Sequence, residues 1–495
     1  MVPGDLGDSR LVNYFLEHCH KFFTGNVSSF WDAPFMFPEK STITFSENML
    51  GSAPFYSFFR IMGLDRPDAY QAWILLMHIL NFSAAYLLFY KIIRNPFSAG
   101  LGAFVFAFSL ALMSQVVTTQ MYPRFPIPLT LLMLYFFMDQ FNPRYFFLAT
   151  LFLVYQFYCV IYLGFILFIP FAAILITTFI VRKDVFFIKI KSIVWWKKIS
   201  IGLIVNIILI IVLLYPYLLR ASLNGSNSYD SIFSTIPTLK SYFFSSIGSF
   251  SWQSLGKIML DEPSFWIHSL FAGAIAVVSY LLFLLFGLAN LTKKTIFSKI
   301  QFDMKMKIFL ISAFVFLLIF TRFGSFSFYK MVFYLPGFGA LRNMCRMINI
   351  QLVFYGLALA FIFSILPFKK TITKFLAFFI LLILLIPDNY TKDLSMYRSS
   401  KIRREQGVEV LQKKLIHIPF GSIISYEPDT LIEYPFVYHL DAMLACQQLN
   451  LICINGYSGN VPVGYYNYAN LLNKSSRILY FSTIGYTPKS LIVIK

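Results

Sequence analysis

Long apolar runs recur between residues 69 and 387, and short polar or basic connections separate them. A helix needs roughly 20 mostly apolar residues to cross about 30 Å of hydrocarbon, and the runs reach or approach that length. The pattern therefore predicts ten transmembrane helices. The stretch 145–181 is interpreted as two of them, because a single helix there is far too long and Tyr162 with Gly164 offers a turn. The ten runs are 69–90, 97–113, 127–138, 145–160, 164–181, 199–219, 266–290, 308–321, 347–366 and 375–387.

The segment 1–68 is polar and rich in acidic side chains. Within it, Leu11 and Phe15 belong to an apolar series at helical spacing, which predicts an amphipathic helix over residues 8–23. Asp8 or Ser9 is suited to be its N-cap. We expect this helix to lie at the membrane interface.

The composition changes abruptly after residue 387. A basic and polar stretch is followed by short β-prone runs that Gly and Pro residues separate. The predicted fold class is therefore mainly α: an external segment over 1–68, a polytopic transmembrane bundle over 69–387, and a small external α/β domain over 388–495. The β-prone runs are 422–426, 451–454 and 491–494.

Composition agrees with lipid as the solvent for most of the chain. Of 495 residues, 58% are hydrophobic and 13% are charged, which leaves too few polar groups to cover a water-soluble protein of this length. The net charge of +19 comes from basic residues between the apolar runs, not from one patch with interleaved aromatic residues, so nucleic-acid binding is not expected. The five cysteines lack metal-ligand or redox spacing; we expect buried free thiols, with a Cys446–Cys453 pair as the alternative.

Basic residues are concentrated in every second connection between the apolar runs. By the positive-inside rule those connections face the cytoplasm, and the opposite connections, the segment 1–68 and everything after Pro387 face outward. The residues assigned to the cytoplasm are Lys91, Arg94, Arg144, Arg182, Lys183, Lys189, Lys191, Lys197, Lys198, Lys293, Lys294, Lys299, Lys305, Lys307, Lys369, Lys370 and Lys374. The opposite connections hold Arg124, Arg220, Lys240, Lys257, Arg322, Lys330, Arg342 and Arg346.

If the segment 1–68 faces outward, it must be carried across the membrane. Met1 opens on a polar segment with neither a signal peptide nor a preceding apolar run. We therefore expect one further helix upstream, which makes roughly eleven spans with a cytoplasmic N-terminus. The alternative is translocation of the first segment by an unusual route.

Acidic residues and arginines occur together on the predicted outer side. Asp5, Asp8 and Glu47 lie in the segment 1–68. A carboxylate can take a proton from a hydroxyl or hold a divalent cation, and a guanidinium can bind two phosphate oxygens at once. The candidates for the positive charge are Arg124, Arg322, Lys330, Arg342 and Arg346.

The same residues also have structural interpretations. Asp5 and Asp8 are suited to cap the helix over 8–23 and to favour its positive end, and each arginine is typical of a side chain that reaches to the headgroups. The histidines lack regular ligand spacing, and no Ser/His/Asp signature, Walker loop or dinucleotide fingerprint occurs. Three polar residues near helix ends or within a span either line a cavity or bond a neighbouring helix: Gln115, Gln120 and Gln156.

Four stretches, in order, resemble the bacterial polytopic proteins of the GT-C glycosyltransferase superfamily, close to the YfhO-like membrane proteins. The resemblance covers nearly the whole chain and depends on the order and spacing of the stretches. The family places a transmembrane helix before the first stretch, where this sequence has none. The stretches are Gly4-Asp5-Leu6-Gly7-Asp8; Phe45-Ser46-Glu47-Asn48-Met49-Leu50-Gly51; Leu335-Pro336-Gly337-Phe338 with Leu341-Arg342 and Arg346; and Asn455-Gly456-Tyr457-Ser458-Gly459 with Pro462.

The resemblance implies a GT-C-type bundle that transfers sugar from a polyprenyl-phosphate donor to a lipid or glycan acceptor. The reaction would occur on the outer face of the bacterial cytoplasmic membrane. Asp5 or Asp8 would act on the acceptor, Glu47 is a second acidic candidate, and Arg342 and Arg346 would bind the donor phosphate. Weaker companions are Arg124, Arg322 and Lys330. A divalent cation is a candidate cofactor for such a site. Membrane lipids are expected as further partners.

Two other classes of function are weighed against this one. A transporter or flippase for a lipid-linked or anionic substrate would use the same arginines without covalent chemistry. It is expected to carry charges deep within spans and paired broken helices in two halves, and the sequence shows neither. A membrane scaffold whose external domain binds a partner is the structural alternative.

Overall fold

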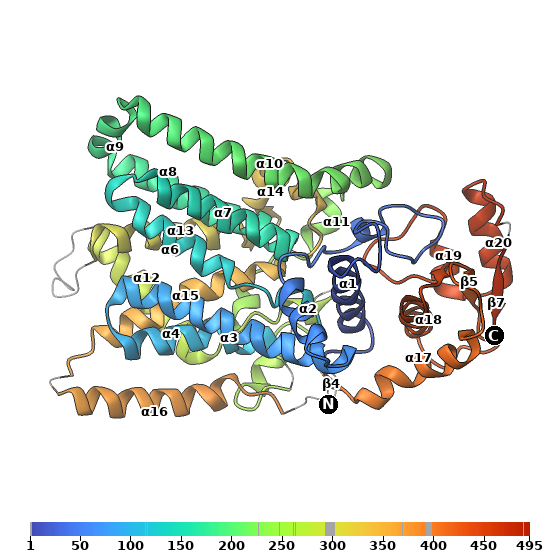
Figure 1. Cartoon of the computed structure of the whole chain (residues 1–495). Helices are drawn as coiled ribbons and strands as arrows, with labels where there is room; N and C mark the ends of the chain where they lie inside the picture. Colours follow the sequence, from blue (N-terminus) through green and yellow to red (C-terminus); the bar gives the residue numbers. More distant parts are fainter. Residues whose placement is uncertain are drawn as a thin grey trace.

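Each of the ten apolar runs forms a helix, and the helices lie side by side in one bundle (Figure 1). This computed structural model describes residues 2–113, 115, 117–225, 227–246, 248–260, 262, 264–292, 302–368, 370–392, 398–488 and 490–495. Four of the predicted cytoplasmic residues lie outside the described residues, namely Lys293, Lys294, Lys299 and Lys369.

Six helical stretches in the described part of the chain are long and apolar enough to cross a membrane. They are α3 (Arg66–Ile93), α8 (Ile161–Val181), α10 (Ile193–Asn224), α12 (Ala274–Leu291), Met344–Ser364, which includes α15 (Ile348–Ser364), and α16 (Thr371–Asn389). The other four predicted runs form apolar helices of 13 to 17 residues. These are α4 (Pro96–Phe108), α6 (Pro126–Gln140), α7 (Pro143–Cys159) and α13 (Met304–Ile319). The chain is therefore built as a helical membrane protein.

Local sequence sets where several of these helices begin. Asn95 and Asn142 each precede a proline, and their side-chain oxygens accept backbone hydrogen bonds from the first turns of α4 and α7. Proline suits the first helical position because it has no N–H to satisfy. Asp65 caps α3 in the same way, through the backbone N–H of Asp68 at 2.9 Å.

Consecutive bundle helices run in opposite directions, so consecutive connections lie at opposite ends of the bundle (Figure 1). At one end, Lys305 Nζ lies 2.6 Å from Asp139 Oδ1, and Arg182 donates to the Asp139 carbonyl at 3.0 Å. These contacts join the ends of α6 and α8 to the start of α13. We call this end, which includes connections 141–142 and 182–192, the basic end.

The opposite end holds the start of the chain. There the backbone N–H of Leu110 donates to Asn389 Oδ1 at 2.8 Å, and that of Ala274 donates to Asp388 Oδ1 at 2.9 Å. These bonds join the C-terminal end of α16 to α5 (Leu110–Met113) and α12. We call this end the α1 end. The two groups of connections that the charge pattern separates are therefore at opposite ends of the bundle.

The helix α15 lies at the centre of the bundle, with almost every residue buried, whereas α10 and α16 are mostly exposed. The central packing depends on small residues. A Cβ on Gly102 of α4 would lie 2.4 Å from the Gly356 carbonyl oxygen of α15, and the reciprocal distance is 2.5 Å. The two backbones approach this closely because neither residue carries a side chain.

The predicted helix over 8–23 forms as α1 (Asp8–Phe23), with Gly7 rather than Asp8 or Ser9 at the N-cap position. It packs between α2 (Ala53–Ile61) with α3 on one side and α18 (Pro435–Leu449) on the other. Protein buries this helix from Ser9 to Cys19, whereas an amphipathic helix on a lipid surface leaves one face uncovered by protein. Its polar residues face both neighbours: Asn13 and Glu17 bond α2 and the start of α3, and Arg10 and Lys21 bond α18.

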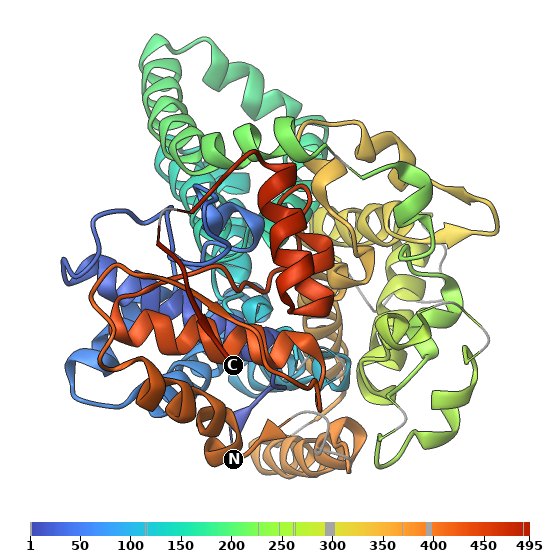
Figure 2. The ribbon, with the colours of Figure 1, turned by 90° about the vertical axis from the view of Figure 1, so that its right-hand side faces the viewer.

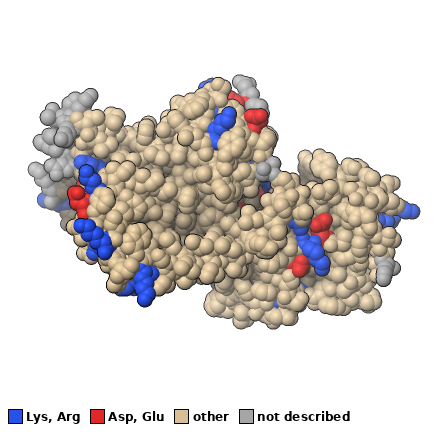
Figure 3. All heavy atoms as spheres, turned by 90° about the horizontal axis from the view of Figure 1, so that it is seen from above, with Lys and Arg blue, Asp and Glu red and all other residues tan. Residues whose placement is uncertain are grey.

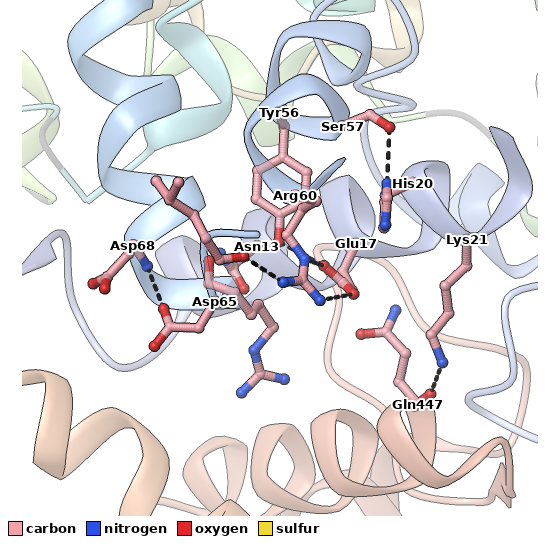
Figure 4. Close-up of polar contacts among 12 residues, drawn as sticks. Asn13, Glu17, His20, Lys21, Tyr56, Ser57, Arg60, Asp65, Asp68 and Gln447 are labelled. Carbon is pink, nitrogen blue, oxygen red and sulfur yellow. Dashed lines mark hydrogen bonds and ion pairs between the residues drawn. The ribbon is translucent and has the colours of Figure 1, made fainter. Parts of the chain in front are cut away.

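Polar contacts fix α1 on both sides (Figure 4). Toward the bundle, Glu17 Oε2 accepts hydrogen bonds from Tyr56 at 2.6 Å and from Arg60 Nε at 2.8 Å. Toward α18, Arg10 forms a buried ion pair with Asp441. The polar face of α1 is thus satisfied by protein groups rather than by water.

The C-terminal part contains a three-stranded parallel sheet in the order β6-β5-β7, formed by the three predicted β-prone runs. Helices connect the parallel strands, as this geometry requires. The strands are β5 (Ile423–Tyr426), β6 (Ile452–Cys453) and β7 (Ile492–Ile494). The helices are α17 (Lys401–Leu415), α18, α19 (Tyr466–Leu471) and α20 (Lys474–Thr483). This part covers much of the α1 end, beside the segment 227–273 (Figure 2).

Short elements complete the fold. β1 (Val2–Pro3) pairs antiparallel with β4 (Arg398–Ser399), which joins the start of the chain to the C-terminal part. The others are α9 (Lys183–Ile190), α11 (Tyr229–Phe233), α14 (Tyr329–Phe333), β2 (Arg322–Phe323) and β3 (Phe326–Ser327). All five cysteines are buried and free, Cys446 and Cys453 included.

Charged side chains are distributed unevenly over the surface seen in Figure 3. Lysines and arginines gather at the basic end, and further charges of both signs lie toward the α1 end and on the C-terminal part. The surface between them is free of charge in this view. The exposed side chains of α10 there are mostly Ile, Leu and Val. Such a band matches the apolar interior of a bilayer.

Candidate functional site

Asp8 begins α1 and its carboxylate faces two other elements. Oδ1 accepts a hydrogen bond from the Tyr457 hydroxyl at 2.9 Å, and Oδ2 lies 3.5 Å from Nε2 of Gln120. Gln120 belongs to the short 3-10 helix η2 (Thr119–Met121), which packs on α1. The carboxylate therefore lies where α1, the membrane bundle and the C-terminal part meet.

Asp5, three residues earlier, has a different environment. Its Oδ1 accepts the backbone N–H of Ser9 at 3.2 Å, so Asp5 satisfies a free donor in the first turn of α1. Burial raises the pKa of Asp5, and the nearby Asp8 raises it further, while Ser9 and Arg404 act against them. Arg404 donates to the Asp5 carbonyl at 3.2 Å and to the Ser9 hydroxyl at 2.8 Å. The capping role predicted for both aspartates thus applies to Asp5.

Arg342 lies in the loop before α15 and contacts the same segment of the C-terminal part as Asp8 does. Its Nη1 donates to the carbonyl of Gly459, two residues after Tyr457. Burial and the neighbouring Arg346 lower the pKa of Arg342, whereas Tyr162 and Asp8 raise it. Arg342 is therefore within electrostatic reach of Asp8 and of a second cation.

Arg346 follows four residues later, in the short 3-10 helix η8 (Met344–Met347) before α15. Its guanidinium carbon lies 4.6 Å from the centroid of the Tyr162 ring, a cation–π contact. Its Nε is buried and has no hydrogen-bond partner among the described residues. A buried donor in this state is suited to an additional oxygen ligand.

Glu47 serves as an anchor for α8. Its two carboxylate oxygens accept the backbone N–H groups of Ile161 at 2.7 Å and Tyr162 at 3.3 Å. Burial raises the pKa of Glu47, while these bonds and Arg346 lower it. A carboxylate at a helix N-terminus favours the positive end of the helix dipole. Glu47 thus fixes the start of α8, and with it the ring on which Arg346 lies.

The remaining predicted basic residues of the outer loops lie elsewhere. Arg322 is 3.7 Å from Glu262 and its guanidinium lies over the Phe233 ring, while Lys330 lies over the ring of Tyr229. Both therefore contact the region of α11 rather than the start of α1.

Arg124 is almost completely buried, with 1% of its surface exposed. Its guanidinium lies over the Phe106 ring of α4 at 4.9 Å. Nε and Nη1 have no hydrogen-bond partner in the part of the chain that the structure describes. A cation buried without a carboxylate is costly, so Arg124 differs from the paired arginines of this protein.

The sequence contains no pattern that predicts a contact of Tyr457 or Gln120 with Asp8. The Asp8–Tyr457 bond spans 449 residues, and no local pattern signals such a contact. The other two glutamines bond neighbouring elements: Gln115 accepts from Asn349 at 3.0 Å, and Gln156 donates to the Pro123 carbonyl at 3.1 Å. Among the described residues, no group of three or more His, Cys, Asp or Glu side chains is placed to hold a metal ion.

An apolar cavity of about 400 Å³ lies between α12, α15 and α16. Ile275, Val278 and Leu282 line it on α12, and Leu359 and Ile362 line it on α15. Its lining is suited to hydrocarbon rather than to a polar ligand.

Models of known protein families and curated proteins were compared with the whole sequence, and neither comparison finds a match.

Proposed function

We propose that this protein is a membrane glycosyltransferase that uses a polyprenyl-phosphate sugar. The ten bundle helices would all cross the bacterial cytoplasmic membrane, with the basic end in the cytoplasm and the α1 end outside. The C-terminal part would then be an extracytoplasmic α/β domain. The bundle would be of GT-C type, as the resemblance of the four stretches implies. The observation that carries the proposal is that one loop at the α1 end binds both groups: Tyr457 donates to Asp8, and Gly459 accepts from Arg342, which has Arg346 as a neighbour.

Sugar transfer needs a base for the acceptor hydroxyl and a binding site for the donor phosphate, close enough together for one donor–acceptor pair to reach both. Asp8 would take the proton of an acceptor hydroxyl, whose oxygen attacks the anomeric carbon of the donor. The bond from that carbon to the phosphate oxygen breaks with inversion, and the electron pair leaves with the polyprenyl phosphate. Arg342 and Arg346 would stabilise the phosphate charge. The apolar cavity beside α12 has room for part of a hydrocarbon chain.

Three features support Asp8 over the other acidic candidates. Asp5 caps α1 and lies beside Arg404, and Glu47 uses both oxygens to cap α8. Among the described residues, Asp8 Oδ2 has a single hydrogen-bond contact, the long one to Gln120. That oxygen is therefore the one best suited to accept a proton from substrate.

The test compares two single variants in lipid nanodiscs. Wild-type protein, supplied with a polyprenyl-phosphate sugar and an extract of envelope lipids and glycans, is expected to release polyprenyl phosphate and to label an acceptor. Asp8→Asn is expected to lose roughly 100-fold or more in kcat, the scale of a lost general base. The matched control Asp5→Asn keeps most of its activity. Full transfer by Asp8→Asn would refute the role of Asp8, and no transfer by wild type with any such donor would refute the function.

Arg124 favours a second candidate, because it is buried in the connection before α6 and its Nε and Nη1 have no hydrogen-bond partner among the described residues. A transporter or flippase for a lipid-linked or anionic substrate is expected to use such a buried cation to bind that substrate. The same nanodisc protein, moved to sealed vesicles, separates the two: translocation of the donor without a transferred product supports the second candidate and contradicts the first.

A further inference from the structure

The loop 455–462 of the C-terminal part contacts three separate elements at the candidate site with three successive residues. Tyr457 donates to Asp8 at the start of α1. Ser458 donates from Oγ to the Phe45 carbonyl at 2.9 Å, in the segment that leads to Glu47. Gly459 accepts from Arg342 through its carbonyl.

We propose that this loop completes the reaction centre, with Tyr457 positioning Asp8 and Gly459 positioning Arg342. The inference rests on the proposed function and goes beyond it, because that function gives the C-terminal part no role in the reaction. Here two of its residues orient the base and a phosphate ligand.

Tyr457 is suited to hold a carboxylate in one orientation. Burial and the neighbouring Asp8 raise the pKa of Tyr457, so its hydroxyl stays protonated and donates. Donation to Oδ1 directs Oδ2 of Asp8 toward Gln120, where an acceptor hydroxyl would replace the 3.5 Å contact. A phenylalanine at 457 keeps the ring and removes only this donor.

Gly459 acts through the absence of a side chain. A Cβ at this position would lie 2.2 Å from Nη2 of Arg342 and 3.1 Å from its guanidinium carbon. An alanine would therefore displace the guanidinium from the carbonyl that orients it. The backbone of Gly459 does not have a positive φ, so alanine introduces no backbone strain of that kind.

The loop is rigid enough to position both groups. Asn455 donates to the Tyr426 carbonyl at 2.9 Å and accepts from the Tyr426 N–H at 2.8 Å, which ties the start of the loop to β5. Gly456 donates its N–H to His439 Nδ1 at 3.0 Å. The Arg10–Asp441 ion pair holds α18 against α1 below the loop.

The decisive measurement separates kcat from KM in the full-length protein in nanodiscs with a polyprenyl-phosphate sugar. Tyr457→Phe is expected to lower kcat roughly tenfold or more, the effect of one hydrogen bond to a charged group, with the donor KM unchanged. Gly459→Ala is expected to raise the donor KM by a similar factor. The control is Tyr466→Phe, an exposed tyrosine of α19, which should match wild type.

A general structural role is distinguished by an Asp8→Ala background. If Tyr457 acts through Asp8, Tyr457→Phe causes no further loss of rate there. Equal loss in both backgrounds, or unchanged kcat in Tyr457→Phe alone, overturns the inference.

Melting temperatures test the Tyr457–Asp8 contact without an activity assay. They are measured for wild type, Tyr457→Phe, Asp8→Ala and the double variant. The Tyr457→Phe change is expected to lower the melting temperature when Asp8 is present and not when it is alanine. If wild type transfers no sugar, the proposed function fails while the melting cycle still reports the contact. If wild type transfers and Tyr457→Phe is unaffected, only the present inference fails.

Discussion

Glu17 illustrates how single buried charges hold α1 in place. Burial alone would raise the pKa of this carboxyl, but hydrogen bonds from Arg60 and Tyr56 outweigh that effect and lower it below its ordinary value of 4.5. A carboxyl with a lowered folded-state pKa binds fewer protons when folded. Its contribution to stability is present above pH 4.5 and is lost as the pH falls through the lowered pKa.

We therefore expect the melting temperature of wild type to fall as the pH is lowered below about 4.5, and Glu17→Gln to fall less steeply there. At neutral pH the variant is less stable, because Arg60 loses its charged partner. The measurement is thermal unfolding in detergent across a pH series. Glu409→Gln, at an exposed position of α17, is the control and should follow wild type. If the melting temperatures of Glu17→Gln and wild type fell equally with pH, the protonation of Glu17 would not be what lowers stability in acid.

At the residue scale, the sequence identified the acidic and basic candidates but did not separate their roles. Asp5 and Asp8 are near neighbours in a helix-start pattern, and either suits a cap. Only the fold shows that Asp5 contacts Ser9 while Asp8 contacts Tyr457. Glu47 had no signal for capping, since the helix that it caps begins 114 residues later.

Gly102 and Gly356 test the packing of α4 against the central helix α15. Gly102→Ala would place a methyl group against the Gly356 carbonyl and force the helices apart, at a cost of about 1–3 kcal/mol. Thermal unfolding in nanodiscs measures the loss. Gly100→Ala, on the same helix, is the control, because its added Cβ would meet Phe378 at an ordinary 3.6 Å. Equal melting temperatures for the two variants would show that the close approach does not limit stability.

At the element scale, the apolar runs predicted all ten bundle helices, because a buried or lipid-facing helix must be continuously apolar over most of its length. The strands of the C-terminal part were likewise marked by β-prone runs between Gly and Pro. The burial of α1 was not predicted. Arg10 and Glu17 are charged, yet both are buried, because Asp441 and Arg60 from other segments neutralise them.

At the scale of the whole molecule, the candidate site lies where three regions meet. The start of α1, the loop before α15 and the loop 455–462 converge, although these segments lie far apart along the chain. Hydropathy predicts the helices and the charge pattern predicts their direction in a membrane, but neither predicts which loops meet. That information lies in long-range contacts such as Arg10–Asp441 and β1–β4.

The number of crossings decides whether that meeting point faces outward. All five native cysteines are buried, so wild type is a low-background template for a membrane-impermeant maleimide. Exposed serines give suitable sites: Ser192 before α10, Ser228 after it and Ser475 in α20. With ten crossings, Ser228→Cys and Ser475→Cys are expected to react in sealed right-side-out vesicles, whereas Ser192→Cys reacts only after detergent is added.

Six crossings give a different result for the same three variants. If only the six longest stretches spanned the membrane, α4, α6 and α7 would leave residues 94–160 on one side, and α10 would cross in the reverse direction. Ser192→Cys would then react together with Ser475→Cys, and Ser228→Cys would be protected. With α13 (Met304–Ile319) also not crossing, Arg342 would still share a compartment with Asp8. That outcome would nevertheless contradict the proposed sidedness, because Ser192 at the basic end would lie in the same compartment as Ser475.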